Sequence, residues 1–157
     1  MVVGASLELF TLGGLTIRHK GEPVRLSTRK GEALLVYLCL ERREHSRERL
    51  ADLLWNSVSQ ARAMGNLRTA LVDLNQYVSD YLIITRQSLM IDPQSPIWVD
   101  SQVLADSVAA SRTDTSTAAM RRLCTAVDLY KGEFLAGFHL RDAEGFEQWQ
   151  VTETERL

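Results

Sequence analysis

Cysteine, histidine and long apolar runs are scarce in this sequence of 157 residues. Its two cysteines, Cys39 and Cys124, lie far apart within apolar helical patterns, so they match neither a metal-binding spacing nor a disulfide framework. We interpret both as small buried hydrophobic side chains in a reducing compartment. No segment approaches the roughly 18 apolar residues of a membrane span, and the pattern of a secretory signal is missing. We therefore expect a soluble, cytoplasmic protein.

Patterns typical of enzymes are also missing. His19, His45 and His139 have no carboxylate or cysteine at a spacing useful for catalysis, and we expect all three at the surface. The LGG and KGE segments lack the glycine spacing and the following Lys-Ser or Lys-Thr of a phosphate-binding loop. The sequence therefore predicts no catalytic residue, no metal site and no cofactor. Catalysis further along a longer parent chain is the alternative.

Positive charge is not in excess. The sequence has 18 Lys and Arg against 20 Asp and Glu, which gives a net charge of -2. The first 92 residues hold 12 basic against 10 acidic side chains, and the remainder holds 6 against 10. A domain that binds duplex DNA usually concentrates its basic residues on one face. The asymmetry is compatible with nucleic acid at the front of the chain but does not by itself indicate it.

Three short strands, separated by glycine turns, are predicted at the start of the chain. They lie near residues 6–12, 15–19 and 23–26. Gly13-Gly14 and Lys20-Gly21 supply the backbone freedom that tight turns between strands require. This segment therefore predicts a small antiparallel sheet.

Three helices are predicted next. Ser27 or Thr28 caps the first, because a side-chain oxygen can accept a hydrogen bond from a free N–H of the first helical turn. Ser46 opens a second, shorter helix with the sequence SRERLADLLW. The third covers about residues 59–79, and its apolar side chains recur at helical spacing. These apolar positions are Leu67, Ala70, Leu71, Leu74 and Val78.

A β-hairpin over about residues 82–92 follows the third helix. Pro93 and Pro96 then interrupt the chain, so we place a domain boundary here, between residues 1–97 and 98–157. The second part has apolar residues at helical spacing and is predicted to be helical. Its last helix shows no C-terminal capping signal, so we expect that this domain is cut short and that the parent chain is longer.

The residues themselves resemble the antibiotic-regulatory-protein (SARP-type) family of bacterial transcription activators. The segments that carry the resemblance are LGGLTI, GEPVRLSTRKGEALLVYL, SRERLADLLW, NLRTALVDL, VD, LYKGEFLAGF and FEQW. They run in the family's order from about Leu7 to the C-terminus. The resemblance implies an α+β fold, with an OmpR/PhoB-like winged helix-turn-helix followed by an all-α, TPR-like bacterial transcriptional activator domain. The hairpin is then the wing.

The resemblance further implies a sequence-specific DNA-binding regulator, an activator, whose third helix lies in the major groove. The groove-facing positions that it implies are Asn66, Arg68, Thr69, Val72 and Asp73. These positions also lie outside the apolar stripe of the third helix. Arg68 is the best candidate for a base contact, because a guanidinium can bond O6 and N7 of guanine together. The alternative is a solvated surface arginine.

Phosphate contacts are implied for Arg47, Trp55 and Arg86. Arg47 and Trp55 match positions that hold phosphates in winged helices of this type, and Arg86 lies at the predicted wing tip. For Trp55 a core position is an equal alternative, since it directly follows Leu53 and Leu54. Its indole N–H can serve a phosphate while the ring packs against the core.

The chain departs from its relatives late in the third helix and in the wing. Relatives tend to carry arginines where this chain has Asp73, Asn75 and Gln76, and their hairpins commonly contain glycine. An acid near the DNA backbone repels phosphates, although Asp73 can instead accept from a cytosine amino group. We therefore expect weak binding of double-stranded DNA by a single domain. Homodimers on promoter repeats, or a partner protein, would compensate.

Protein partners are implied as well. The loop near residues 56–60 contacts RNA polymerase in winged helices of this type, and the helical half would supply dimer contacts or contacts with later domains of the same chain. The alternative function is a protein-interaction or signalling module of a larger regulator, with weak or lost DNA binding. Asp73 and the low net charge favour that alternative.

Overall fold

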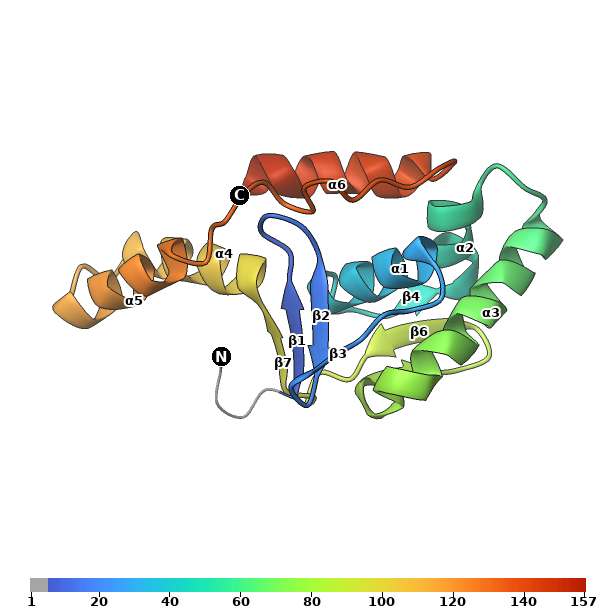
Figure 1. Cartoon of the computed structure of the whole chain (residues 1–157), viewed down its shortest axis with the longest axis horizontal. Coiled ribbons are helices and arrows are strands. Elements are labelled where there is room, and N and C mark those ends of the chain that lie inside the picture. The colour runs from blue at the N-terminus through green and yellow to red at the C-terminus, as the bar shows by residue number, and fades with distance from the viewer. Residues whose placement is uncertain (1–5) are drawn as a thin grey trace.

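Two small sheets and a set of helices make up the chain in the computed structural model, which describes residues 6–157 (Figure 1). The strands are β1 (Leu7–Phe10), β2 (Thr16–His19), β3 (Glu22–Pro23), β4 (His45–Ser46), β5 (Leu82–Ile84), β6 (Ser88–Ile91) and β7 (Ile97–Val99). The helices are α1 (Arg29–Leu40), α2 (Arg47–Trp55), α3 (Gln60–Val78), the short 3-10 helix η1 (Ser79–Tyr81), α4 (Asp100–Ser111), α5 (Thr117–Val127) and α6 (Glu144–Arg156). The predicted α+β class is confirmed. Within residues 6–157, no helix is both long enough and apolar enough to cross a membrane.

The first sheet combines the opening strands with one strand from much later in the chain. Its order is β3-β2-β1-β7, and the neighbours among β1, β2 and β3 pair antiparallel, as predicted. β7 runs parallel to β1, with Leu7 opposite Ile97. The sequence does not predict β7, because its three residues after Pro96 show no alternation of apolar and polar side chains that would indicate a strand. Only the distant partner strand makes them a strand.

The second sheet is the predicted hairpin with one added strand. β5 and β6 pair antiparallel, and β4 pairs with the other edge of β6. β4 contains only His45 and Ser46, directly before α2. The hairpin is therefore joined through β4 to the beginning of α2.

Hydroxyl side chains cap the first three helices. Thr28 Oγ1 accepts from the Gly31 amide of α1 at 3.0 Å, and Ser46 Oγ accepts from the Arg49 amide of α2 at 3.1 Å. Ser59 Oγ likewise accepts from the Arg62 amide of α3 at 3.3 Å. These caps satisfy N–H groups that have no partner inside the helix, which is why each helix begins where the sequence predicts.

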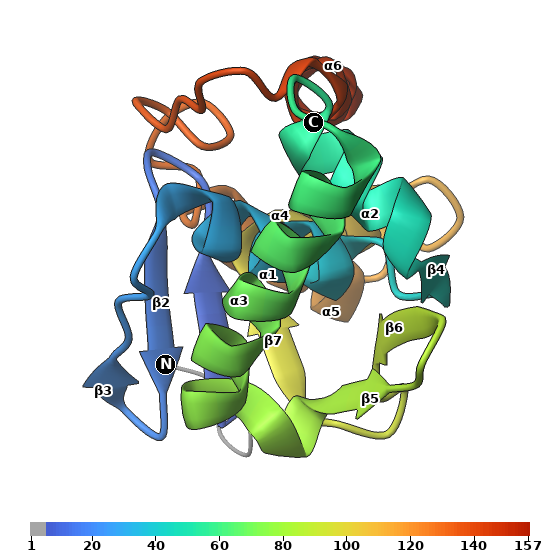
Figure 2. The same cartoon turned by 90° about the vertical axis from the view of Figure 1, so that its right-hand side faces the viewer.

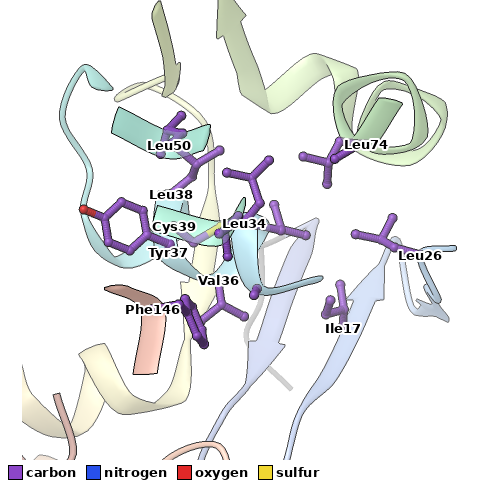
Figure 3. Close-up of a cluster of buried hydrophobic side chains, with 14 of the residues drawn as sticks. Ile17, Leu26, Leu34, Val36, Tyr37, Leu38, Cys39, Leu50, Leu74 and Phe146 are labelled. Atoms are coloured by element: carbon purple, nitrogen blue, oxygen red, sulfur yellow. The ribbon is translucent and has the colours of Figure 1, made fainter. Parts of the chain in front are cut away.

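The hydrophobic core is a continuous cluster built around α1 (Figure 3). Leu34 and Leu38 of α1 are fully buried, and Leu50 of α2 and Leu74 of α3 pack into the same cluster. Phe146 of α6 is also fully buried there and approaches α1 from a different side than Leu74 (Figure 3). Elements before and after residue 97 therefore share this core.

The helices α4 and α5 form a pair that projects from the first sheet (Figure 1). Leu104 of α4 and Ala126 of α5 are buried together with Leu12, which follows β1. Val127 and Tyr130 remain 53% and 49% exposed. The predicted helical character of this half is confirmed, and its TPR-like stacking stays a proposal.

Helix α6 packs onto the N-terminal half of the chain, against α1 and α2 (Figure 1). Trp149 Nε1 donates to Glu41 Oε1 at 3.0 Å, and its ring centroid lies 5.1 Å from that of Tyr37. Gly145 permits a close approach to α2, because a Cβ at this position would lie 3.2 Å from the Leu53 carbonyl oxygen. The α6 contacts thus anchor the last helix to α1 and α2.

Two expectations about single side chains are wrong. Cys39 is buried, as predicted, and burial raises the pKa of its thiol to about 12, but Cys124 is exposed on α5. The α4–α5 pair covers only one side of each helix, and Cys124 lies on an uncovered side. His45 is not at the surface but 3% exposed in β4, where its Nε2 lies 2.8 Å from the Glu41 carbonyl oxygen. Its burial follows from the pairing of β4 with β6.

The buried imidazole of His45 predicts a loss of stability in mild acid. Burial lowers its pKa below the ordinary value of 6.5, so the unfolded chain binds more protons than the folded chain once the pH falls below 6.5. The free energy of unfolding should therefore fall between pH 7.5 and pH 5.5 more steeply in the natural protein than in His45→Gln. Urea unfolding at several pH values measures this. His139→Gln, at an exposed position, should leave the slope unchanged. Equal slopes in all three proteins would contradict the prediction.

Candidate nucleic-acid interface

Helix α3 lies on the outside of the molecule, with the β5–β6 hairpin beside it (Figure 2). One side of this 19-residue helix is buried against α1 and α2. The buried side consists of Ala63, Leu67, Ala70, Leu71, Leu74 and Val78. The predicted apolar stripe is therefore confirmed, and the opposite side of α3 faces solvent.

The five predicted groove-facing positions fall on two parts of the solvent side of α3. Arg68 is exposed and Val72 is 60% exposed, at positions one helical turn apart. Asn66, Thr69 and Asp73 lie on the flank that borders the segment leading into α1. Arg68 and Val72 are thus accessible to a large ligand.

Asp73 has a partner within the protein. Its Oδ2 accepts from the Ser27 amide at 2.7 Å and its Oδ1 accepts from the Ser27 hydroxyl at 3.0 Å. The carboxylate therefore ties the second half of α3 to the residues just before α1. The sequence gives no sign of this contact, because Ser27 is 46 residues away.

Arg47 joins the beginning of α2 to the hairpin. Its Nε and Nη2 donate to the Thr85 carbonyl oxygen at 3.0 and 2.6 Å, and its amide donates to the Gln87 carbonyl oxygen at 2.9 Å. A guanidinium has five N–H donors, so donors remain for a second acceptor such as a phosphate. Arg47 therefore fixes the hairpin against α2 whatever else it binds.

The hairpin turn is held without glycine. Thr85 Oγ1 accepts from the amides of Gln87 and Ser88 at 3.2 and 2.9 Å, and it lies 2.8 Å from the Ser88 hydroxyl oxygen. This threonine supplies the hydrogen bonds of the turn, so the backbone at Arg86 and Gln87 needs no positive φ. Arg86 is exposed at the tip.

Trp55 belongs to the hydrophobic core. It is buried at the end of α2, and the Lys30 ammonium lies 5.8 Å from the centroid of its ring. The core interpretation of Trp55 is thus confirmed. Its edge also borders a groove beside α3.

This groove was not predicted. It runs between α3, the first turn of α1 and the segment that precedes α6, and three of its lining side chains are basic: Arg29, Lys30 and Arg141. The adjacent Arg29 and Lys30 at a predicted helix start were a signal for local positive charge. No local signal places Arg141, because its position depends on how residues 138–143 pack on the core.

The order of sheet, helices and hairpin defines a winged-helix fold, and a known structure has the same arrangement. The structure of Mycobacterium tuberculosis EmbR in complex with a low-affinity phosphopeptide is similar to this chain, with a TM-score of 0.71 and 21% sequence identity. The match covers 96% of this chain and 42% of the EmbR chain, and at this identity it shows a shared fold. No protein-family model matches the chain, and no curated protein matches its sequence.

Proposed function

We propose that this chain is a sequence-specific DNA-binding transcription regulator, an activator, that inserts α3 into the major groove. The observation that carries the proposal is the exposed polar side of α3 beside a hairpin fixed to α2 by Arg47. The major groove of B-DNA is about 12 Å wide and admits one α-helix. A wing beside the inserted helix reaches the neighbouring backbone.

The base contacts are assigned to the accessible side of α3. Arg68 would donate two hydrogen bonds to O6 and N7 of a guanine, and Val72 would pack against a thymine methyl group. Asn66 and Thr69 offer further donors and acceptors on the flank of the helix. Asp73 is held by Ser27 and is assigned to positioning α3, with an acceptor role toward cytosine as the alternative.

The phosphate contacts are assigned to Arg47, Trp55 and Arg86. Arg47 at the start of α2 contacts the hairpin at Thr85, and Arg86 lies next to it at the hairpin tip. Both side chains would therefore contact the same strand of the DNA backbone. Cations that neutralise phosphates release bound counterions, which makes the affinity depend on salt. Trp55 would donate its indole N–H from the edge of the core.

The second half is assigned to regulation. We propose residues 1–97 as the DNA-binding domain and residues 98–157 as the beginning of a helical, TPR-like regulatory domain that would form dimers on promoter repeats or contact later domains. Strand β7 (Ile97–Val99) crosses this boundary, because it pairs with β1. Because α6 packs on α1 and α2, a movement of that domain would change the position of these two helices. The loop near residues 56–60, between α2 and α3, is the proposed contact for RNA polymerase.

The substitution Arg68→Ala tests the assignment of α3. It should weaken binding to the preferred duplex by about 1–3 kcal/mol and reduce the preference for that duplex over a scrambled one. Fluorescence anisotropy with DNA from upstream of the protein's own gene measures both quantities. Arg121→Ala, an exposed arginine on α5 at the far end of the molecule from α3, serves as the control (Figure 1). If Arg68→Ala keeps both the affinity and the preference, Arg68 does not read a base.

A further inference from the structure

We propose that the groove beside α3 binds the phosphate backbone of the DNA, and that Lys30 and Arg141 are two of its phosphate-binding residues. This inference rests on the proposed function, because it assumes that α3 enters the major groove. It extends the DNA-binding surface from the winged helix to a residue of the second half of the chain.

Segments far apart in the sequence meet in this groove. α1 contributes Arg29 and Lys30, α3 contributes Asn66 and Thr69, and the segment before α6 contributes Arg141. In Figure 2 this last segment runs above α1 and leads into α6. The groove thus joins the proposed base-reading helix to a cluster of cations.

The groove runs beside α3 for a length that suits a backbone strand. Asn66, Thr69 and Asp73 border it at successive helical turns, and seven residues of helix rise about 10 Å. A helix in the major groove has a phosphate backbone along each of its sides. The hairpin lies on one side of α3, so this groove is placed to receive the second strand.

Positive charge prevails in the groove. Its lining has three cations against one carboxylate, Asp73, whose two oxygens already accept hydrogen bonds from Ser27. Among residues 6–157, no carboxylate oxygen lies within 4.0 Å of the cationic groups of Arg29, Lys30 or Arg141. Asp142, next to Arg141, attracts Lys30 over a longer distance. Arg29 lies over the Phe138 ring and near the Glu32 carboxylate, whereas Lys30 and Arg141 are available to an external anion.

Lys30 is held where an anion would stabilise its charge. Its ammonium lies over the Trp55 ring, and burial lowers its pKa, against the opposing effect of Asp142. A lysine that has lost part of its water gains more from a nearby phosphate than a fully solvated one does. The phosphate would take the place of the missing water.

Arg141 lies in a segment whose neighbouring residues are buried in the core. Phe138, Leu140 and Ala143 are buried in the core, whereas His139 and Arg141 between them are exposed. The buried residues fix the backbone, so the Arg141 side chain starts from a defined position beside the groove. A flexible tail would lose more conformational entropy on binding.

The test is the salt dependence of DNA binding by the full chain. Each phosphate neutralised contributes about 0.9 to the slope of log K against log salt concentration. Arg141→Ala and Lys30→Ala should each lower the magnitude of that slope by about one, and weaken preferred and scrambled duplexes by the same factor. Arg141→Lys should restore the slope. Arg121→Ala is the control, and thermal unfolding shows that every variant is folded.

The outcomes separate this inference from the proposed function. If the natural protein binds DNA and Arg141→Ala, Lys30→Ala and Arg141→Glu all leave its slope unchanged, the groove does not bind phosphate and the function of α3 still stands. If the natural protein binds no duplex at low salt, both proposals fail. A reduced slope in Lys30→Ala alone would overturn the assignment of Arg141.

Discussion

Replacing Phe146 by alanine is expected to lower the free energy of unfolding by about 3–5 kcal/mol. The side chain is 0% exposed, and its ring centroid lies 6.3 Å from that of Phe138 and 5.3 Å from that of Trp149. Truncation removes apolar contact area and leaves a cavity between α6 and the core around α1. Because the neighbouring helices cannot collapse into that cavity, the loss of unfolding free energy should lie near the upper end of what single substitutions cause.

Urea unfolding followed by tryptophan fluorescence measures the Phe146 effect. Val151→Ala on the same helix is the matched control, because Val151 is 51% exposed and should change stability by less than about 0.5 kcal/mol. Since Phe146 belongs to the same core as Leu34 and Leu38, the loss should appear in the main unfolding transition. A loss confined to a separate, minor transition would mean that α6 does not stabilise the winged helix.

Asp100→Ala is expected to cost about 3–4 kcal/mol of stability. Asp100 is 2% exposed, and its Oδ1 accepts from the Thr11 amide, the Thr11 hydroxyl and the Ser101 amide at 2.7–2.8 Å. Its Oδ2 accepts from the Leu12 amide at 3.0 Å. Alanine would leave these buried donors without an acceptor, and the link between the end of β1 and the start of α4 would be lost.

Two further variants define the role of Asp100. Asp100→Asn keeps one carbonyl oxygen but points an NH2 group at the Leu12 amide, so its cost should be smaller than that of alanine and still measurable. Asp106→Ala is the control on the same helix, since Asp106 is exposed. Thermal and urea unfolding give the values. Equal stabilities for Asp100→Ala and Asp106→Ala would show that the four hydrogen bonds do not hold α4 in place.

The winged-helix elements could be predicted because their signals are local. Thr28 and Ser46 cap their helices within a few residues, and the apolar stripe of α3 repeats within the helix itself. The hairpin follows from two β-rich runs with a polar turn. These features depend on neighbouring residues, which a single sequence displays directly.

The remaining features depend on partners far along the chain. β7 exists because Ile97–Val99 finds β1, and β4 exists because His45 pairs with Leu89. The acceptor role of Asp100 toward Thr11 spans 89 residues. A sequence pattern with no local periodicity cannot indicate such contacts, so these strands and this hydrogen-bond centre were not predicted.

The candidate interface shows the same division. The exposure of Arg68 and Val72 follows from the helical pattern, and the burial of Trp55 follows from its leucine neighbours. The contact between Asp73 and Ser27 and the approach of Arg141 to α3 depend on tertiary packing. The charge of the proposed DNA-binding surface could therefore not be judged from the residues of α3 alone.

DNA binding by the purified chain at two salt concentrations tests the proposed regulator most directly. The ligands are a fluorescent duplex from upstream of its own gene and a scrambled duplex of equal length. We expect binding at low salt that prefers the upstream duplex and weakens steeply as the salt concentration rises. No binding of either duplex at low salt would contradict DNA recognition and would favour the protein-interaction module.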